Sequence, residues 1–234
     1  MVGDRLKYAC YCGSRNLYGD MATACKALLR NSDVDRVWLL IEDAEFPEHL
    51  PHEVEAIDVS GQKFFRPDGP NMGSRYTYLA MIRAALCHVL PPYVHRVLSM
   101  DVDTLAVRDV STVWDTPMDG CYFAAAREAH RCYEGLLYTN TGVALYDLDM
   151  LRGGKADEVI DVLNRRAYTW VEQDVLNYLC QGRIALMDGN YNACDWTDHP
   201  DPKMLHYAGY NDWRERPEVW AYRDMTWDEA RRGR

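Results

Sequence analysis

The first hundred residues alternate between short, continuously apolar runs and longer stretches with apolar residues at helical spacing. Strands are predicted where these runs lie, at residues 6–12, 37–41 and 94–100, because such runs are typical of buried strands, and a weaker strand is predicted at residues 54–59. Helices are predicted between them at residues 17–29, which Asn16 can cap, and 75–89, which Pro91 ends. This alternation indicates an α/β fold with a parallel sheet.

The second half has a less regular pattern. Strands are predicted at residues 122–126, 142–146, 184–187 and 204–207, and helices at residues 155–164 and 172–180. Two polar stretches are predicted to be loops, namely residues 61–73, rich in glycine and proline, and residues 129–138, a natural cover for a substrate. The aromatic tail after Trp213 can pack on the body or lie over a site.

Two aspartates end the apolar run at residues 94–100. Asp101 and Asp103 are spaced i, i+2, and in an extended chain such residues point to the same side. They lie at the carboxyl edge of a predicted sheet, where open α/β folds bind ligands. Two carboxylates so close repel each other unless a cation lies between them, and a divalent ion shared with substrate phosphates suits this role. The pattern therefore favours chemistry on a phosphorylated, nucleotide-linked substrate.

Composition and charge narrow the choice further. A chain of 234 residues, 48% of them hydrophobic, can form one domain with a sizeable core. The formal charge of −10 argues against binding to nucleic acid or anionic membranes, although it leaves room for a local basic cleft. No apolar stretch approaches the roughly 20 residues of a membrane span, and the N-terminus lacks the apolar core of a signal peptide. We therefore expect no membrane span and a cytoplasmic location.

The eight cysteines are predicted to be free thiols. The cytosol is reducing, and the chain contains no Cys-x-x-Cys pair that would indicate a structural zinc ion. Cys10 and Cys12 should share one face of the first strand. We expect the cysteines to act as small, buried hydrophobic residues.

Three further polar motifs follow in order. Asn140 and Gly142 lie just before a predicted strand, Glu172 to Asn177 opens a predicted helix, and His206 ends a strand ahead of a glycine turn at Gly209. Each motif alone is also typical of an ordinary turn, of acidic residues at a helix start or of a surface histidine. Their joint order with Asp101 and Asp103 is more specific than any one of them.

Taken together, these motifs resemble those of glycosyltransferase family 8. This family of retaining nucleotide-sugar transferases includes glycogenin and bacterial lipopolysaccharide galactosyl- and glucosyltransferases, and the resemblance runs from about residue 6 to residue 213. It implies a GT-A type fold, which is a Rossmann-like, nucleotide-binding mixed sheet flanked by helices in a single domain. Residues 1–105 would then form the nucleotide-binding half, residues 106–213 the sugar and acceptor half, and residues 214–234 a C-terminal tail.

The resemblance implies a metal site and a donor site. Asp101, Asp103 and His206 would bind Mn²⁺ or Mg²⁺, with Asp101 also near the ribose, and the ion would act as a Lewis acid on the departing diphosphate. Tyr18 matches the residue that stacks on uracil, although it can equally pack on a neighbour in the first helical turn. Arg83, or Arg75 if the register differs, would reach the donor phosphate or sugar.

The resemblance places the remaining matched residues around the donor sugar. Asn140, Gln173 and Asp174 would line it, with Gln173 near the anomeric carbon, and Gly209 would complete the donor site. An amide is a poor nucleophile, so the expected mechanism is front-face substitution within an ion pair, in which the leaving diphosphate assists deprotonation of the acceptor. The expected reaction moves glucose or galactose from a UDP-sugar to a glycan, a protein or a small molecule.

The chain also departs from the family pattern. Asp212 stands where relatives often have a lysine that binds diphosphate, and Arg214 or Arg216 would have to replace that cation. Glu172 replaces the usual first aspartate of the helix motif. The chain lacks the basic, aromatic C-terminal extension of some relatives, so a lipid-linked acceptor is less favoured.

Two alternative functions stay open at this point. Met100 to Leu105 also resembles the first motif of haloacid-dehalogenase-type phosphohydrolases, in which Asp101 would be the nucleophile and Asp103 the acid/base. Against this, two or three predicted βα units precede the motif, and only Asp188 offers the later acid where that family needs a pair. The other alternative is a non-catalytic sugar- or nucleotide-binding protein, which the seven tryptophans and 16 tyrosines would suit.

Overall fold

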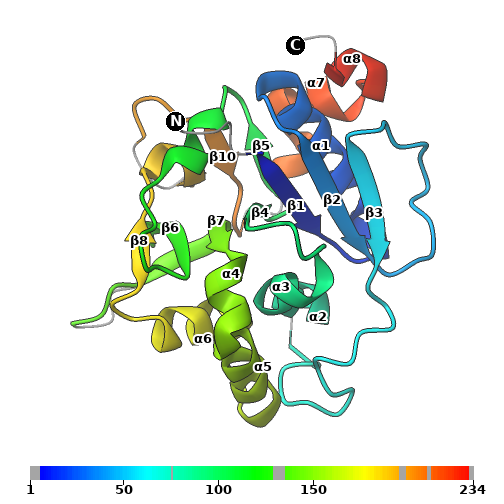
Figure 1. The fold of residues 1–234 in the computed structure, drawn as a ribbon. Helices are drawn as coiled ribbons and strands as arrows, with labels where there is room; N and C mark the ends of the chain where they lie inside the picture. The colour runs from blue at the N-terminus through cyan, green and yellow to red at the C-terminus, as the bar shows by residue number, and fades with distance from the viewer. Residues whose placement is uncertain (1–5, 75, 129–134, 195–198, 210–211, 232–234) are drawn as a thin grey trace.

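A seven-stranded mixed sheet forms the centre of the molecule (Figure 1). The computed structural model describes residues 6–74, 76–128, 135–194, 199–209 and 212–231. The strands are β1 (Tyr8–Cys12), β2 (Arg36–Ile41), β3 (Val54–Asp58), β4 (Arg96–Met100), β6 (Phe123–Arg127), β7 (Thr139–Asp147) and β8 (Ile184–Leu186). Their order is β3-β2-β1-β4-β7-β6-β8, in which β1 to β4 are parallel and β7 runs antiparallel to both of its neighbours. The predicted α/β class is confirmed.

A second, three-stranded sheet lies beside the first. It contains β5 (Thr104–Ala106), β10 (Met204–His206) and β9 (Ala193–Cys194), in the order β5-β10-β9. The sequence analysis predicts neither β5 nor β9. Both strands are too short to show a periodic pattern, and β5 forms because it pairs with β10, a hundred residues later in the chain.

Alternating residues of the parallel strands face two separate cores. Ala9, Val37 and Leu39 pack on the side of helix α1 (Tyr18–Asn31), and Cys10 and Trp38 pack on the opposite side. That opposite face is covered by α2 (Tyr78–Met81), α3 (Leu86–Val89), α4 (Leu148–Met150), α5 (Ala156–Arg165) and α6 (Val171–Leu179). Strands buried on both faces explain why their sequences read as continuous apolar runs.

Two predicted elements differ in detail from those observed. The helix expected at residues 75–89 is divided into α2, a 3₁₀ segment (Ile82–Ala85) and α3, and Arg75 lies outside the described residues. Strand β7 begins at Thr139, so Asn140 lies inside this strand and not ahead of it. Of the loop expected at 129–138, residues 129–134 lie outside the described part of the chain, while residues 61–73 contain neither helix nor strand, as predicted.

The C-terminal tail packs on the body of the protein. Helices α7 (Pro217–Arg223) and α8 (Trp227–Arg231) lie along α1, where Asn31 donates a hydrogen bond to the Tyr222 hydroxyl at 2.8 Å (Figure 1). Cys10 and Cys12 face the same core, as predicted, and the seven described cysteines form no disulfide with one another. None of the helices in the described ranges combines the length and the apolar character needed to cross a bilayer.

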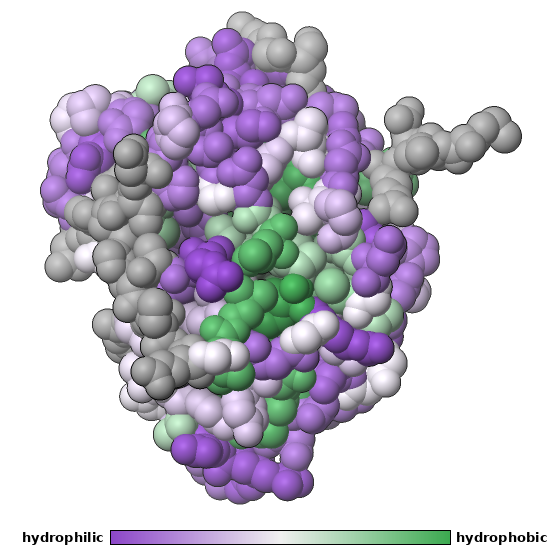
Figure 2. Space-filling model, turned by 90° about the vertical axis from the view of Figure 1, so that its left-hand side faces the viewer, coloured by the Kyte–Doolittle hydropathy of each residue, from purple (hydrophilic) through white to green (hydrophobic). Residues whose placement is uncertain are grey.

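The edge strand β8 carries an exposed apolar side chain, Leu186, which is 52% exposed. Figure 2 views the molecule from the left of Figure 1, where β8 lies, and shows hydrophobic residues gathered in the middle of this face. Hydrophilic residues surround them, as the acidic composition leads one to expect.

Candidate active site

The two aspartates converge because the chain turns between them. Asp101 follows the end of β4, Val102 and Asp103 form a turn, and the chain then enters β5. The backbone N–H of Asp101 donates to the carbonyl of Gly142 at 2.7 Å, and the Thr104 hydroxyl donates to the carbonyl of Asp101 at 2.6 Å. The expectation of an extended i, i+2 pair is therefore wrong, although its conclusion that the carboxylates lie together holds.

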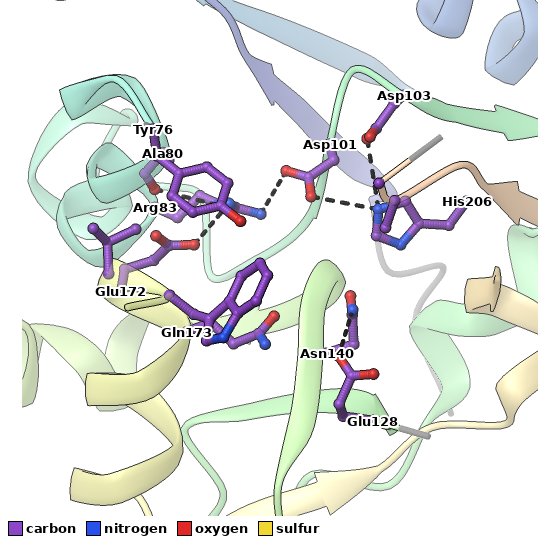
Figure 3. A pocket seen from close by; sticks show the side chains of 14 residues that line it. Tyr76, Ala80, Arg83, Asp101, Asp103, Glu128, Asn140, Glu172, Gln173 and His206 are labelled. Atoms are coloured by element: carbon purple, nitrogen blue, oxygen red, sulfur yellow. Dashed lines mark hydrogen bonds and ion pairs between the residues drawn. The ribbon is translucent and has the colours of Figure 1, made fainter. Parts of the chain in front are cut away.

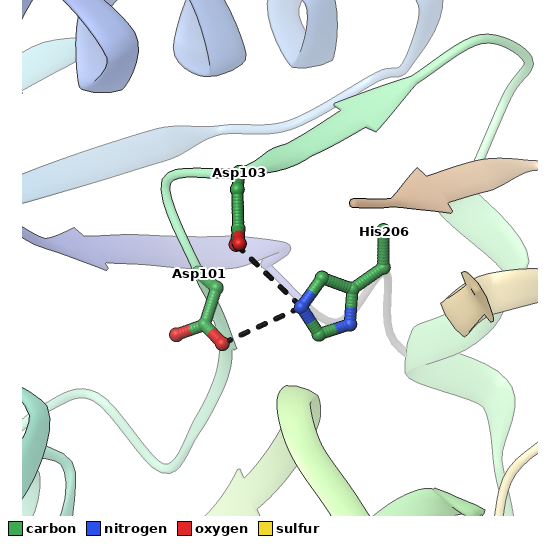
Figure 4. A group of neighbouring side chains, drawn as sticks. All are labelled: Asp101, Asp103 and His206. Carbon is green, nitrogen blue, oxygen red and sulfur yellow. Dashed lines mark ion pairs between the residues drawn. The ribbon is translucent and has the colours of Figure 1, made fainter. Parts of the chain in front are cut away.

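Strand β10 brings His206 to the same point. His206 pairs with Thr104 across β10 and β5, and its Nε2 lies 3.6 Å from Asp101 Oδ2 and 3.5 Å from Asp103 Oδ1 (Figure 4). One ligand atom from each of the three residues lies within 4.8 Å of the others. Of the groups that could hold a metal ion, this is the one found among the described residues.

Both nitrogens of the buried His206 ring indicate a metal ligand. The Asn192 side chain donates from Nδ2 to Asn140, so its Oδ1 accepts from His206 Nδ1 at 2.7 Å. This bond fixes the ring and leaves Nε2 directed at the aspartates, without a hydrogen-bond partner in the described part of the chain. Two carboxylates and an oriented imidazole nitrogen suit Mn²⁺, with Mg²⁺ as the harder alternative.

Gly142 leaves the space that the His206 ring occupies. A Cβ atom on this residue would overlap Cε1 of His206 and lie 2.7 Å from Asp101 Oδ2. Strand β7 therefore passes close to the candidate metal ligands, and only glycine permits the approach.

Arg83 connects the aspartates to helix α6. Its guanidinium lies 2.8 Å from Asp101 Oδ1 and 2.7 Å from Glu172 Oε1, and it donates to the carbonyl of Thr141 at 3.0 Å. Figure 3 shows the resulting row of ion pairs, which runs Glu172, Arg83, Asp101, His206 and Asp103. Arg83 and Glu172 are both buried, so this cation is held in place by the fold.

One arginine faces two carboxylates, and the pKa values reflect this. Burial raises the pKa of Glu172 to about 7, against the opposing charge of Arg83. Burial also raises the pKa of Asp101, which Arg83 opposes and Asp103 reinforces. The pKa of Asp103 is lowered in spite of burial, because the His206 ring stabilises its carboxylate.

The structure separates Gln173 from Asp174. Gln173 lines the main cavity, accepts from the Thr141 backbone N–H at 3.0 Å and donates to the Tyr138 hydroxyl at 3.2 Å. Asp174 does not line this cavity. Its carboxylate accepts from the Tyr138 hydroxyl at 2.5 Å and from the Trp170 backbone N–H at 2.9 Å.

A strained residue begins helix α6. Val171 has φ +33°, which a β-branched residue rarely adopts, and it directly precedes Glu172 and Gln173. Backbone strain of this kind persists only where the surrounding structure enforces it, and it is typical of functional sites. The strain here coincides with the turn that directs Glu172 towards Arg83 and Gln173 into the cavity.

Two adjoining cavities open around these residues. The main cavity, of about 360 Å³, has Gln173, Asn140, Glu128, Trp170, Ala208 and Gly209 among its lining residues. The adjoining cavity, of about 350 Å³, is lined by residues that include Gly13, Ser14, Asn16, Leu17, Trp213 and Arg214. Both share Tyr76, Ala80, Arg83, Asp101 and Asp103, so the candidate metal site lies where they meet.

Most of the expected site residues line the main cavity, but Asp174 and Tyr18 do not. Asp101, Asp103, His206, Arg83, Asn140, Gln173 and Gly209 line the main cavity. Tyr18 is buried against Phe46, and its hydroxyl donates to Asp43 and accepts from the Glu42 N–H, so the structure does not bring it to either cavity. Its predecessor Leu17 lines the adjoining cavity instead.

The basic residue near Asp212 is Arg214. Arg214 lines the adjoining cavity and binds Asp20 through Nε and Nη2. Arg216 and Asp212 are not among the residues that line either cavity.

Three residues with acidic or aromatic side chains in the main cavity were not predicted from the sequence. Glu128 accepts a hydrogen bond from Asn140 at 3.0 Å, and Tyr76 and Trp170 face each other with ring centroids 5.9 Å apart. The position of Glu128 just beyond the apolar strand β6 is the same signal that identified Asp101. No comparable pattern distinguishes Tyr76 or Trp170 from packing aromatics.

Replacing Arg83 by methionine should destabilise the fold strongly. Arg83→Met leaves the buried Glu172 carboxylate without a cation, and breaking a buried pair in this way costs about 3–5 kcal/mol. The double variant Arg83→Met/Glu172→Met should recover much of this loss, as measured by urea unfolding. Arg66→Met, which breaks the exposed pair with Asp68, is the control and should have no measurable effect on stability. Equal losses of stability in Arg83→Met and Arg66→Met would contradict the argument.

Metal binding should strengthen as the pH rises. Burial alone would lower the pKa of His206, but Asp103, Cys194 and the charge of Asp101 raise it well above its ordinary value of 6.5. A metal ligand must lose that proton, so the affinity for Mn²⁺ should increase about tenfold per pH unit until the pKa is passed. The folding stability of the metal-free protein should instead fall as the pH rises. The stabilisation by protonated His206 is complete below pH 6.5 and is lost as the pH rises through the raised pKa.

Calorimetric titration with Mn²⁺ across this pH range measures the effect. In His206→Gln the affinity should be weaker, and its pH dependence should be reduced to the contribution of Asp101. A pH-independent affinity in the unmodified protein would exclude His206 as a ligand.

Comparison with known proteins identifies similarity to glycosyltransferases. The sequence profile described as Glycosyl transferase family 8 matches residues 43–215. The glycosyltransferase GlyF of Streptococcus pneumoniae serotype 4 (strain ATCC BAA-334 / TIGR4) is 22% identical over 225 residues, which cover 85% of this chain and 54% of GlyF. The chain thus spans about half the length of that relative.

Solved structures share the fold. The galactosyltransferase LgtC, in complex with donor and acceptor sugar analogs, superposes with a TM-score of 0.71 at 17% identity, covering 92% of this chain and 95% of LgtC. The glycosyltransferase GlyE of Streptococcus pneumoniae TIGR4 superposes with a TM-score of 0.75 at 18% identity, covering 98% of this chain and 63% of GlyE. These likenesses confirm the predicted GT-A type fold.

Proposed function

Because the chain belongs to glycosyltransferase family 8, we propose that it transfers glucose or galactose from a UDP-sugar to an acceptor with retention of configuration. The observation that carries the proposal is the orientation of His206. Its buried Nε2 has no hydrogen-bond partner within the described ranges and faces Asp101 and Asp103 at the junction of two cavities. A metal-bound diphosphate at this junction would have room for a nucleoside on one side and a sugar on the other.

The adjoining cavity suits the nucleoside. It lies at the carboxyl end of β1, and its lining includes Ser14, Asn16 and Leu17, which offer backbone and polar side-chain groups to a base. Arg214 lines the same cavity and uses only Nε and Nη2 for Asp20, so its Nη1 is left to meet a phosphate. In this proposal Arg214 replaces the lysine that relatives have in place of Asp212.

The main cavity suits the donor sugar and the acceptor. A divalent ion bound by Asp101, Asp103 and His206 would neutralise the charge that develops on the diphosphate. Arg83, fixed between Asp101 and Glu172, would orient the sugar, and Asn140 and Glu128 would bind its hydroxyls from the other wall. Trp170 and Tyr76 would exclude water and offer ring faces to the acceptor.

The proposed reaction is a front-face substitution. The bond between the anomeric carbon and the diphosphate oxygen breaks, the acceptor oxygen bonds to the same face of that carbon, and its proton passes to the leaving diphosphate. Gln173 would lie beside the anomeric carbon, with its side-chain amide held in place by Thr141 and Tyr138. Asp174 would hold the wall behind Gln173 through Tyr138, because its carboxylate does not line this cavity.

Calorimetry with UDP, in the presence and absence of Mn²⁺, tests the proposal. We expect binding that depends on the metal, followed by slow hydrolysis of UDP-glucose or UDP-galactose in which proton NMR detects the retained anomer first. Metal-dependent binding without hydrolysis or transfer would favour a non-catalytic sugar-binding protein. Absence of UDP binding under both conditions would overturn the proposal, and hydrolysis of p-nitrophenyl phosphate would then indicate the phosphohydrolase alternative. The expected cytoplasmic location stays a prediction.

A further inference from the structure

A third cavity, of about 330 Å³, lies beside helix α6 and shares no lining residue with the main cavity. We call it the tyrosine pocket, because its lining includes Tyr138, Tyr168 and Tyr178, together with Leu136, Arg166 and Asp174. Its volume falls at the lower end of the range for small-molecule sites.

Part of the lining is exposed to solvent. Tyr178 is 67% exposed on the surface of α6, and Leu136 is 43% exposed. An exposed tyrosine beside a cavity offers a ring face to the apolar surface of a ligand, and its hydroxyl adds a hydrogen-bonding group.

The polar groups of the pocket include both charges. The guanidinium of Arg166 is exposed, lies over the Tyr168 ring at 5.6 Å and makes no hydrogen bond to another described residue. Asp174 uses one lone pair of each oxygen for Tyr138 and Trp170, which leaves further lone pairs as acceptors. One cation and one carboxylate do not favour an ionic ligand of either sign, and they suit a neutral ligand rich in hydroxyls.

The Tyr138 hydroxyl connects the pocket to the main cavity. Tyr138 donates to Asp174 at 2.5 Å and accepts from Gln173 Nε2 at 3.2 Å. Gln173 lines the main cavity and Asp174 lines the tyrosine pocket. A ligand that contacts Tyr138 or Asp174 therefore touches the residues that position Gln173.

We propose that the tyrosine pocket is a second carbohydrate-binding site, which holds a sugar residue of a glycan acceptor apart from the residue that reacts. The role of the bound sugar as part of an acceptor rests on the proposed transferase function. The binding of a sugar to the pocket does not depend on that function. The rings of Tyr168 and Tyr178 stack on the apolar face of a pyranose, and Arg166 and Asp174 bind its hydroxyls. The site favours glycan acceptors over proteins and small molecules.

The test uses the full chain labelled with 3-fluorotyrosine, without metal or nucleotide. Lactose, maltotriose, cellotriose and chitotriose are titrated separately to millimolar concentrations, and ¹⁹F NMR follows the signals of Tyr168 and Tyr178, which are assigned with Tyr→Phe variants. We expect at least one saccharide to shift both signals in a saturable manner. Tyr178→Ala and Arg166→Gln should each weaken that binding by about tenfold or more, which corresponds to about 1.4 kcal/mol.

Tyr93→Ala is the matched control, because Tyr93 is also an exposed tyrosine, at 56%, and lines none of the three cavities. It should bind the saccharide as the unmodified protein does. Failure of all four saccharides to shift the signals would overturn the inference, as would equal binding by Tyr178→Ala and Tyr93→Ala. Metal-dependent binding of UDP, measured separately in Tyr178→Ala, should be unchanged, which distinguishes this result from a failure of the proposed function.

Discussion

Asp103→Asn is expected to abolish the metal-dependent binding of UDP. The substitution removes one of the two carboxylates that face His206 Nε2 and leaves an amide, which is a poor ligand for Mn²⁺. Loss of residues that merely support a metal ligand costs about 10–100-fold in affinity, so loss of a ligand itself should exceed ~100-fold. Calorimetry with UDP and Mn²⁺ measures the change, and the small component of binding that needs no metal should persist.

The fold should survive this substitution. Asp103 is half-buried at a turn, and its backbone carbonyl, which accepts from the Tyr207 N–H at 2.9 Å, is unaffected. Asp161→Asn is the matched control, since Asp161 lies on the surface of α5 and pairs only with Arg165 among the described residues. Equal affinity in Asp103→Asn and Asp161→Asn would show that the ion is not bound at this site.

Site residues that directly follow an apolar strand can be predicted from the sequence. Asp101 follows β4 and Glu128 follows β6, so both lie at one edge of the sheet, and the same reasoning would have found Glu128. The convergence of Asp101 with Asp103 was predicted for the wrong reason. A turn and the pairing of β5 with β10 bring them together, and no local pattern shows a contact between segments a hundred residues apart.

Helical residues show why single positions are harder to predict than motifs. Successive residues of a helix point about 100° apart, so neighbouring side chains can meet different cavities, as Gln173 and Asp174 do. Leu17, which ends the 3₁₀ segment before α1, lines the adjoining cavity, whereas the next residue, Tyr18, is buried. A shift of one residue at the start of a helix decides which side chain meets the ligand, and the sequence pattern does not resolve it.

Gly142→Ala should remove metal binding without changing any ligand. The added Cβ would overlap the His206 ring and press on Asp101 Oδ2 and Asn140 Oδ1. The ring cannot retreat, because it is buried and its Nδ1 donates to Asn192 at 2.7 Å. We expect a loss of Mn²⁺-dependent UDP affinity comparable to that in Asp103→Asn, together with a destabilisation of about 1–3 kcal/mol from overpacking.

A second substitution separates the two effects. In Gly142→Ala/His206→Ala the ring that the methyl group meets is gone, so stability in urea should recover relative to Gly142→Ala while metal binding stays lost. Gly19→Ala is the matched control, because a Cβ there meets nothing within 4 Å, and replacing a helical glycine by alanine should stabilise α1 by about 0.5–1 kcal/mol. If Gly142→Ala bound Mn²⁺ and UDP as Gly19→Ala does, the His206 ring would be able to move aside without loss of metal binding. The metal would then not depend on the close approach of β7 that this structure shows.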